Sequence, residues 1–212
     1  MAKQEKRRGG ELICIIGHNN TGKTVFATQI AEDFNNRRKA VNLRNYPPNY
    51  YKLAVYDVQN RFTDFFQKGD ISIEHSDKEW AKKLLGLRKS LVILDDYKVL
   101  VPNDQMDKSL LDLLQYRAEY GIDIVIITHS PKLVLERLSY FIDTYCLFYT
   151  VGSNKVFKDR LGASEVLTEL KKIIDKEYKR YNGNEYSKLY PNFPFIFYDG
   201  RNEKAKLVNF KQ

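Results

Sequence analysis

The sequence LICIIGHNNTGKT, residues 12–24, decides the fold that this chain adopts. Its first part, residues 12–16, is apolar and rich in isoleucine, which is typical of a strand buried on both faces. A loop with the spacing G-x-x-x-x-G-K-T follows from Gly17 to Thr24, and residues 23–34 have the apolar spacing of a helix. Backbone N–H groups at the start of a helix bind phosphates, and glycines let the backbone come close to them. The segment therefore predicts a phosphate-binding loop between a strand and a helix.

Two side chains of this loop have predicted roles in binding ATP and Mg²⁺. Lys23 supplies a cation for the β- and γ-phosphates, and the hydroxyl of Thr24 is a ligand for Mg²⁺. Lys23 is counted among the catalytic residues as well. The residues expected to contact the nucleotide are Gly17, His18, Asn19, Asn20, Thr21, Gly22, Lys23, Thr24 and Val25.

Acidic and polar residues end two further apolar runs. Residues 91–94 are followed by Asp95, which can hold the Mg²⁺ shell from the end of a buried strand. Asp96 is then placed to orient or deprotonate the attacking water, and His129, after the next long strand, is predicted to contact the γ-phosphate or the water. Strands often end in acidic turns, and a lone histidine is more often structural. Together with the loop, these residues predict Mg²⁺-dependent hydrolysis of ATP.

Strands and helices alternate along the chain, which predicts an α/β fold. Strands are expected at residues 12–16, 53–56, 71–74, 91–94, 122–128 and 145–150, and helices at residues 23–34, 79–87, 107–120, 131–139 and 165–181. This order implies a mostly parallel sheet with right-handed crossovers and flanking helices, as in P-loop NTPases of the RecA/ASCE-like kind. Ligands of such sheets bind beyond the carboxyl ends of the strands. Gly17, Asp57, Asp95 and Thr128 are all expected there.

The length of 212 residues suits one α/β domain. We expect a flexible basic arm at residues 1–10, the P-loop ATPase domain at residues 11–181, and a C-terminal loop and hairpin extension at residues 182–212. Cys14 and Cys146 lie in apolar runs and are predicted to be buried thiols. No segment resembles a secretory signal or has the about 20 apolar residues of a membrane span. A cytoplasmic protein that does not itself span a membrane is therefore expected.

The chain is basic, with a net charge of +8 and a pI near 9.2. An excess of this size is compatible with a polyanionic partner such as DNA. A solvated helix face or tail gives the same pattern. Basic residues gather at Lys3, Lys6, Arg7 and Arg8, at Arg37, Arg38 and Lys39, and at Lys171, Lys172, Lys176, Lys179 and Arg180.

Residues 116–131 resemble a segment of the FtsK/HerA superfamily of DNA translocases. They contain Arg-Ala-Glu-Tyr-Gly and then a strand that ends in Thr-His-Ser-Pro, where the superfamily has Arg-Ala-x-x-Gly and a strand ending in Thr-Gln-x-Pro. Residues 54–62 are similar to the second strand of that superfamily, and residues 151–163 are similar to its stretch after the fifth strand. The resemblance spans residues 11–180.

Within that superfamily, a small single-domain chain is most similar to the viral ATPases that package double-stranded DNA. The resemblance implies a homo-oligomeric ring, expected to be a hexamer, that pumps duplex DNA through its centre. Capsid or membrane-vertex proteins are further expected partners, and the location is then the host cytoplasm or the virion. In such rings an arginine of the neighbouring subunit stabilises the charge on the phosphoryl group. Arg117 is the first candidate for this arginine and Arg160 is the second.

The chain departs from the family at two positions. Asp96 stands where glutamate is common, and His129 stands where glutamine is common. An ATPase for phage assembly or export, related to zonula-occludens-toxin-like proteins, and a nucleotide-dependent switch acting on protein therefore remain as alternatives. The shorter carboxylate favours the switch. An ABC-type ATPase is not favoured, because residues 77–90 lack a Leu-Ser-Gly-Gly-Gln-like signature.

Overall fold

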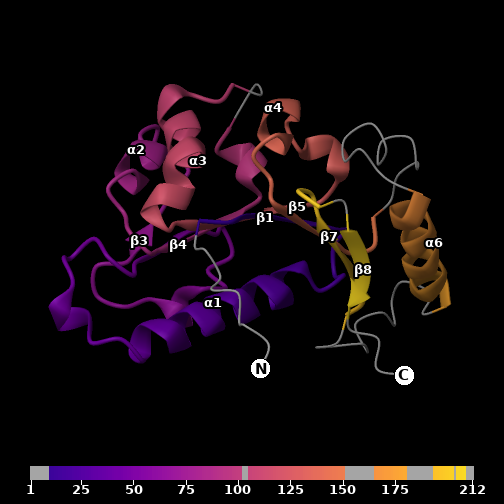
Figure 1. Ribbon diagram of the computed structural model, residues 1–212, viewed down its shortest axis with the longest axis horizontal. Helices are drawn as coiled ribbons and strands as arrows, with labels where there is room; N and C mark the ends of the chain where they lie inside the picture. Colours follow the sequence, from indigo (N-terminus) through magenta and orange to yellow (C-terminus); the bar gives the residue numbers. More distant parts are fainter. Residues whose placement is uncertain (1–9, 102–104, 151–164, 181–192, 203, 209–212) are drawn as a thin grey trace.

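A computed structural model describes residues 10–101, 105–150, 165–180, 193–202 and 204–208. These residues form a single mixed sheet of eight strands with helices on both faces (Figure 1). The strands are β1 (Leu12–Ile16), β2 (Leu53–Tyr56), β3 (Ile71–Ser72), β4 (Leu91–Asp95), β5 (Asp123–Thr128), β6 (Thr144–Leu147), β7 (Phe195–Asp199) and β8 (Lys204–Val208).

The strands lie in the order β3-β2-β4-β5-β1-β6-β7-β8. All pairings from β3 to β6 are parallel, which confirms the predicted α/β fold, whereas β7 and β8 are antiparallel additions beside β6. Ile16 of β1 pairs with Thr128 of β5, and Asp95 of β4 pairs with Ile127. This register brings the carboxyl ends of β1, β4 and β5 together at one edge of the sheet.

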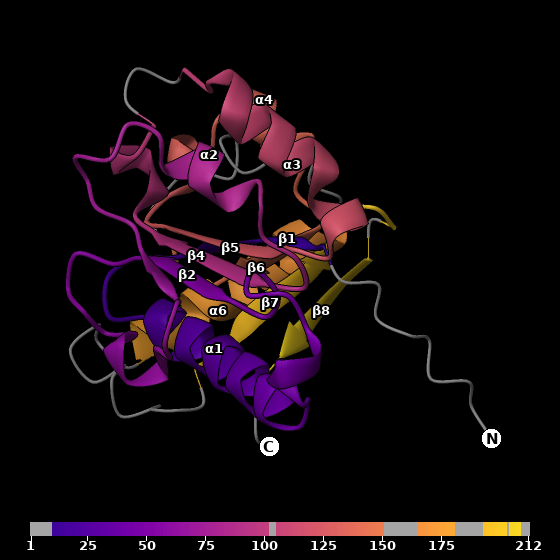
Figure 2. The same cartoon turned by 90° about the vertical axis from the view of Figure 1, so that its left-hand side faces the viewer.

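Helices cover the two faces of the sheet unequally. One long helix, α1, lies under one face, and α2, α3 and α4 lie over the other (Figures 1 and 2). A further helix, α6, packs against β7 and β8. Apolar side chains of the strands fill the core on each face. The helices are α1 (Lys23–Lys39), α2 (Trp80–Leu84), α3 (Lys108–Tyr120), α4 (Glu136–Ser139) and α6 (Glu165–Arg180).

The limits of α3 follow from its end residues. The side chain of Asp107 accepts a hydrogen bond from the backbone N–H of Leu110 at 2.7 Å, which caps the amino end. Gly121 ends the helix with a φ of 66°, a left-handed conformation that glycine adopts without strain. Both limits agree with the sequence pattern.

Helix α1 is longer than predicted, because Asn35 does not end it. Asn35 is buried, and its side chain donates to the carbonyl of Phe65 at 3.4 Å and accepts from Arg38. Arg38 is also buried and pairs with Asp70 at 2.8 Å. Contacts with a distant segment therefore hold the side chain of Asn35, the first residue after the predicted helix, and the helix continues to Lys39.

Three other segments differ from the sequence prediction. Residues 131–139 form a 3-10 turn, Pro131–Leu133, and then the short α4, instead of one helix. Strand β3 has only two residues, and β6 ends at Leu147. The hairpin expected near the C-terminus is β7 and β8, and it belongs to the main sheet because β7 pairs with β6.

Cys14 and Cys146 are buried free thiols, as predicted. Within the described ranges, no helix combines the length and the apolar character that crossing a membrane requires.

Candidate nucleotide site

The loop from Gly17 to Thr24 joins β1 to α1 at the carboxyl edge of the sheet. Its backbone continues the sheet, because the N–H of Gly17 donates to the carbonyl of Thr128 at 3.1 Å and the N–H of His18 donates to Tyr149 at 2.6 Å. A Cβ on Gly17 would lie 2.6 Å from the Cβ of Phe148. Glycine is therefore required there by close packing.

Gly22 is required for two reasons. Its φ is 94°, which side chains rarely adopt, and a Cβ would lie 2.4 Å from the ring of Phe193. Phe193 precedes β7, so the C-terminal part of the chain packs directly on this loop. Of the other loop residues, Thr21 is buried, Thr24 and Val25 are half-buried, and His18, Asn19 and Asn20 are exposed.

Lys23 is buried and turned into the loop. Its Nζ donates to the carbonyl of His18 at 2.7 Å, and the hydroxyl of Thr21 donates to the same carbonyl at 2.7 Å. Burial lowers the pKa of Lys23 to about 8, and the nearby Arg61 lowers it while Asp96 opposes the shift. An anion that enters the loop therefore stabilises the charged form of this buried ammonium group.

Asp95 and Asp96 leave β4 in different directions. Side chains alternate along a strand, so Asp95 faces the same side as Ile93, which packs in the core beneath α1. Thr24, at the start of α1, lies on that side too. Asp96 has a φ of 59° and a ψ of 47°, a left-handed conformation in which aspartate and asparagine are enriched. The turn at Asp96 separates the two carboxylates, and Asp96 interacts electrostatically with Lys23.

His129 is brought to the same place at the end of β5. Burial lowers its pKa, Lys23 lowers it further, and Asp96 raises it. The imidazole is therefore neutral at pH 7 and can accept or donate a hydrogen bond. Lys23, Thr24, Asp95, Asp96 and His129, which are scattered in the sequence, thus meet at the carboxyl ends of β1, β4 and β5.

Two buried hydroxyl groups beside the carboxylate strand lack a hydrogen-bond partner among the described residues. They belong to Tyr56, at the end of β2, and Thr128, at the end of β5. Burial raises the pKa of Tyr56, and Asp96 raises it further, so this phenol lies near the proposed water-activating carboxylate. Buried groups of this kind usually have a partner, which a bound ligand or water can supply.

Arg61 is the site residue that the sequence prediction missed. Its Nη1 donates to the Thr24 hydroxyl at 2.9 Å, and its Nη2 pairs with the carboxylate of Asp95. Arg61 belongs to the polar loop after β2, and a single arginine in a loop has no periodicity that would mark it. The available signals were its position four residues after Asp57, another strand-end carboxylate, and its place within residues 54–62, which resemble the second strand of the FtsK/HerA superfamily.

The residues present fit Mg²⁺. The hydroxyl of Thr24 and a carboxylate oxygen of Asp95 both contact one cationic group, the guanidinium of Arg61. They are oxygen ligands of the kind that Mg²⁺ prefers, and Mg²⁺ usually takes its other ligands from phosphates and water. Thr24 and Asp95 are therefore suited to hold the ion beside the phosphates.

Comparison with known proteins gives matches of structure but none of sequence. No protein-family model and no curated protein matches this sequence. B204, the DNA-packaging ATPase from Sulfolobus Turreted Icosahedral Virus, has a TM-score of 0.60 at 16% identity over 97% of this chain and 100% of that chain. B204 from Sulfolobus turreted icosahedral virus 2, in complex with AMP, has a TM-score of 0.61 at 12% identity over 92% of this chain and 96% of that chain.

This chain has the fold of the genome-packaging ATPases. The resemblance found in the sequence is thereby confirmed at the level of fold. The packaging-ATPase fold is not limited to viruses: ATPases 2 and 3 of EccC from Thermomonospora curvata, in complex with a signal sequence peptide, have a TM-score of 0.54 at 12% identity. That match covers 95% of this chain and 37% of the EccC chain.

Within the packaging-ATPase fold, Arg117 lies at the opposite edge of the sheet from the nucleotide loop. Its guanidinium donates to Asp143 at 2.9 Å and to the carbonyl of Phe141 at 2.7 Å, and the residue is only 8% exposed. Asp143 in turn accepts from the N–H of Leu12, at the amino end of β1. This arrangement does not favour the expected contact with a neighbouring subunit, because the guanidinium of Arg117 already binds groups of its own subunit. Arg160 lies outside the described residues.

We expect the Arg117→Ala substitution to destabilise the fold by roughly 3 kcal/mol, because it leaves the buried carboxylate of Asp143 with a weaker set of partners. Arg201 still contacts Asp143, so the expected loss of stability lies at the lower end of the roughly 3–5 kcal/mol that breaking a buried ion pair costs. Urea unfolding measures the change, and Arg37→Ala, at an exposed arginine, is the control. Unchanged stability, with activity restored by mixing with a Lys23→Ala variant, would instead support a role between subunits.

Nucleotide binding should depend on pH through Lys23. Because the pKa of Lys23 is about 8, the free site is partly uncharged above that pH. A bound triphosphate favours the ammonium form, so binding should take up a proton at about pH 8.5 and affinity should fall as the pH rises further. Calorimetry in two buffers of different ionisation enthalpy measures this uptake. The same titration at about pH 7 should show almost none.

Proposed function

We propose that this chain is an ATP-driven motor that moves double-stranded DNA and packages a viral genome into a capsid. The observation that carries the proposal is the convergence of Lys23, Thr24, Asp95 and Asp96 at one edge of the sheet. It is supported by a fold that aligns over 97% of this chain with a DNA-packaging ATPase. The net charge of +8 agrees with a polyanionic substrate.

Each part of the site has a role in the proposed hydrolysis. The loop amides and Lys23 bind and orient the phosphates, while Thr24 and Asp95 hold Mg²⁺. When bound, Mg²⁺ neutralises charge on the phosphate oxygens. Asp96 orients the attacking water and takes its proton, and neutral His129 donates to the γ-phosphate or to the water. These roles require no covalent intermediate, which is usual for phosphoryl transfer to water.

The proposed motor is a homo-oligomeric ring, expected to be hexameric, with ATP bound between subunits. The resemblance of the sequence to the FtsK/HerA superfamily implies this assembly, and Arg160 is the second candidate, after Arg117, for the arginine that reaches a neighbouring site. Such an arginine is worth about 10³–10⁵ in rate. Capsid or membrane-vertex proteins are the proposed docking partners in the host cytoplasm or virion.

Phosphate release with and without duplex DNA tests the proposal. At about 50 mM salt, duplex DNA should stimulate hydrolysis, and at about 200 mM salt the stimulation should largely disappear because phosphate contacts dominate binding. Heparin, a polyanion without a duplex, is the matched control for charge alone, and Lys23→Ala is the control for contaminating ATPases. Stimulation by DNA but not by heparin supports the motor.

Hydrolysis that DNA does not stimulate would instead favour a protein substrate. The fold shared with EccC, which is known in complex with a signal sequence peptide, supports this second candidate. The chain would then act in assembly or export, or as a nucleotide-dependent switch.

A further inference from the structure

The guanidinium of Arg61 lies among three acceptors that belong to three different segments. It donates to the hydroxyl of Thr24 at 2.9 Å and forms an ion pair with Asp95. Its Nε lies 3.6 Å from the carboxylate of Asp57. The oxygen atoms of Thr24 and Asp95 that contact Arg61 are the same atoms that are proposed to bind Mg²⁺.

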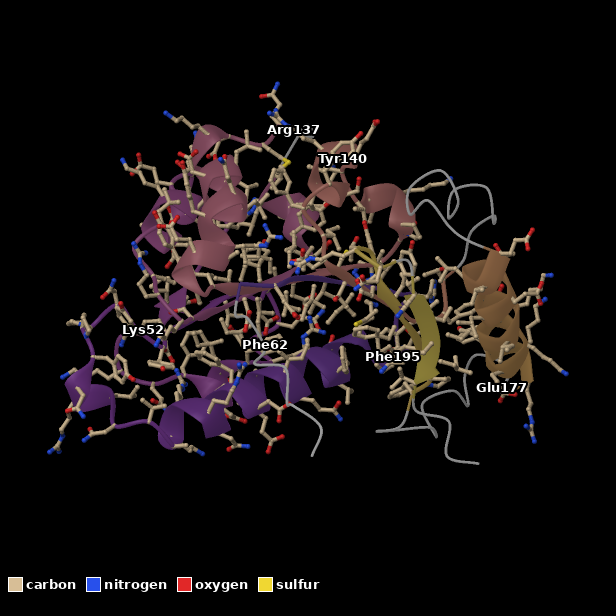
Figure 3. All side chains as sticks on the ribbon, in the orientation of Figure 1. Lys52, Phe62, Arg137, Tyr140, Glu177 and Phe195 are labelled. Carbon is tan, nitrogen blue, oxygen red and sulfur yellow. The ribbon has the colours of Figure 1, made fainter. Side chains whose placement is uncertain are left out.

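A structured turn holds Arg61 in this position. The carboxylate of Asp57 accepts hydrogen bonds from the backbone N–H groups of Gln59, at 2.9 Å, and of Arg61 itself. Asn60 has a φ of 54°, which tightens the turn. Phe62 is 1% exposed and anchors the end of the turn between the sheet and α1, where Figure 3 labels it. The backbone conformation of this turn thus places the side chain of Arg61 beside Thr24 and Asp95.

We propose that Arg61 is a built-in counter-cation of the metal site, which neutralises Asp95 in the empty protein and is displaced when Mg²⁺ and nucleotide bind. This inference rests on the proposed nucleotide site and adds its regulation. A divalent cation and a guanidinium cannot share two oxygen atoms, because like charges a few ångströms apart repel strongly away from bulk water. Asp95 is only 7% exposed, so an empty site without Arg61 would leave a buried carboxylate unpaired.

The displacement has two consequences. Mg²⁺ must compete with Arg61, so the empty state lowers the apparent affinity for the metal-bound nucleotide. The turn from Asp57 to Arg61 must also rearrange, since the guanidinium is tied to it. Val58 projects from this turn and is 72% exposed. The state of the site is therefore transmitted to the protein surface at Val58.

Binding of a fluorescent ADP analogue to the full chain, with Mg²⁺ and with EDTA, tests the inference without turnover. In Arg61→Gln, the ratio of the affinity with Mg²⁺ to that with EDTA should rise about tenfold, because the competitor for the metal oxygens is gone. Arg44→Gln, at an exposed arginine beyond the far end of α1, is the matched control and should leave the ratio unchanged.

An unchanged or smaller ratio in Arg61→Gln would overturn the inference and make Arg61 a phosphate ligand or a structural residue. Failure of the proposed nucleotide site looks different, because the unmodified protein would then bind no nucleotide under either condition, and failure of the DNA motor is seen separately as hydrolysis that duplex DNA does not stimulate. A protein that binds nucleotide and shows an unchanged ratio in Arg61→Gln thus contradicts the counter-cation alone.

A second measurement keeps Arg61 in place and covers the case in which Arg61→Gln does not fold. Val58→Cys offers an exposed thiol for a fluorescent label, whereas Cys14 and Cys146 are buried and burial raises the pKa of both thiols. Mg²⁺ with ADP should change the signal of the label, and ADP with EDTA should change it much less. Equal signals under the two conditions would show that the turn does not respond to the metal.

Discussion

Replacement of Lys23 by alanine should abolish nucleotide binding at ordinary concentrations. The substitution removes the buried cation that faces the phosphates, a loss of roughly 3–4 kcal/mol or about 10²–10³-fold in affinity. Calorimetric titration with ADP and with a non-hydrolysable ATP analogue measures it. Lys39→Ala is the matched control, because Lys39 is an exposed lysine at the other end of the same helix.

The folded state of Lys23→Ala should be no less stable than that of the original protein. Burial of the Lys23 ammonium is unfavourable, as its lowered pKa indicates, so its removal relieves a cost of folding. Thermal unfolding without nucleotide therefore separates loss of binding from loss of fold. Near-normal nucleotide affinity in a folded Lys23→Ala protein would contradict the assignment of the loop.

Replacement of Asp96 by asparagine should leave nucleotide affinity little changed and slow hydrolysis by about 10²–10⁴-fold, the usual contribution of a positioned general base. Asparagine tolerates the left-handed backbone at this position as well as aspartate does, so the turn after β4 should persist. Single-turnover hydrolysis, with affinity measured in parallel, gives the two quantities separately.

Asp112→Asn, on α3, is the matched control for Asp96→Asn and should hydrolyse ATP at the normal rate. If Asp96→Asn also hydrolysed at the normal rate, another group would have to activate the water, and His129 would be the next to test. A loss of affinity equal to the loss of rate would assign Asp96 to nucleotide binding.

The same backbone conformation accounts for one departure from the resembling family. Glutamate is common at the position of Asp96 in that family, but its longer side chain is less suited to a φ of 59°. The short carboxylate is thus matched to its local backbone. It does not by itself indicate a site that has lost its chemistry.

The parts of the site that the sequence predicted well are those whose chemistry is local. Residues 17–24 carry their own pattern, and Asp95 and Asp96 follow an apolar run whose end fixes their place in a parallel sheet. Arg61 could not be predicted in this way, since its contact with Thr24 spans 37 residues and depends on how one turn is built. For Arg117, the family resemblance suggested contact with a neighbouring subunit. Its burial and its ion pair with Asp143 depend on the tertiary structure, which the local sequence does not reveal.

The helix limits and strand pairings were likewise predictable where neighbouring residues determine them, and not where distant residues do. Asp107 and Gly121 limit α3 through contacts with neighbouring residues, and both limits were predictable. Asn35 fails to end α1 because its side chain contacts the carbonyl of Phe65 across the fold. The pairing of β7 with β6 is likewise set by packing between distant segments, so the sequence indicated a hairpin without its place in the sheet.

The position of β1 also governs the order in which the protein becomes functional during its synthesis. β1 and the loop after it leave the ribosome before the strands that flank β1, which start only at residues 123 and 144. Phe193, which packs on Gly22, emerges later still. The loop can take its final shape only after these neighbouring segments have been made. We therefore expect a nascent chain to bind nucleotide only after Phe193 has been made.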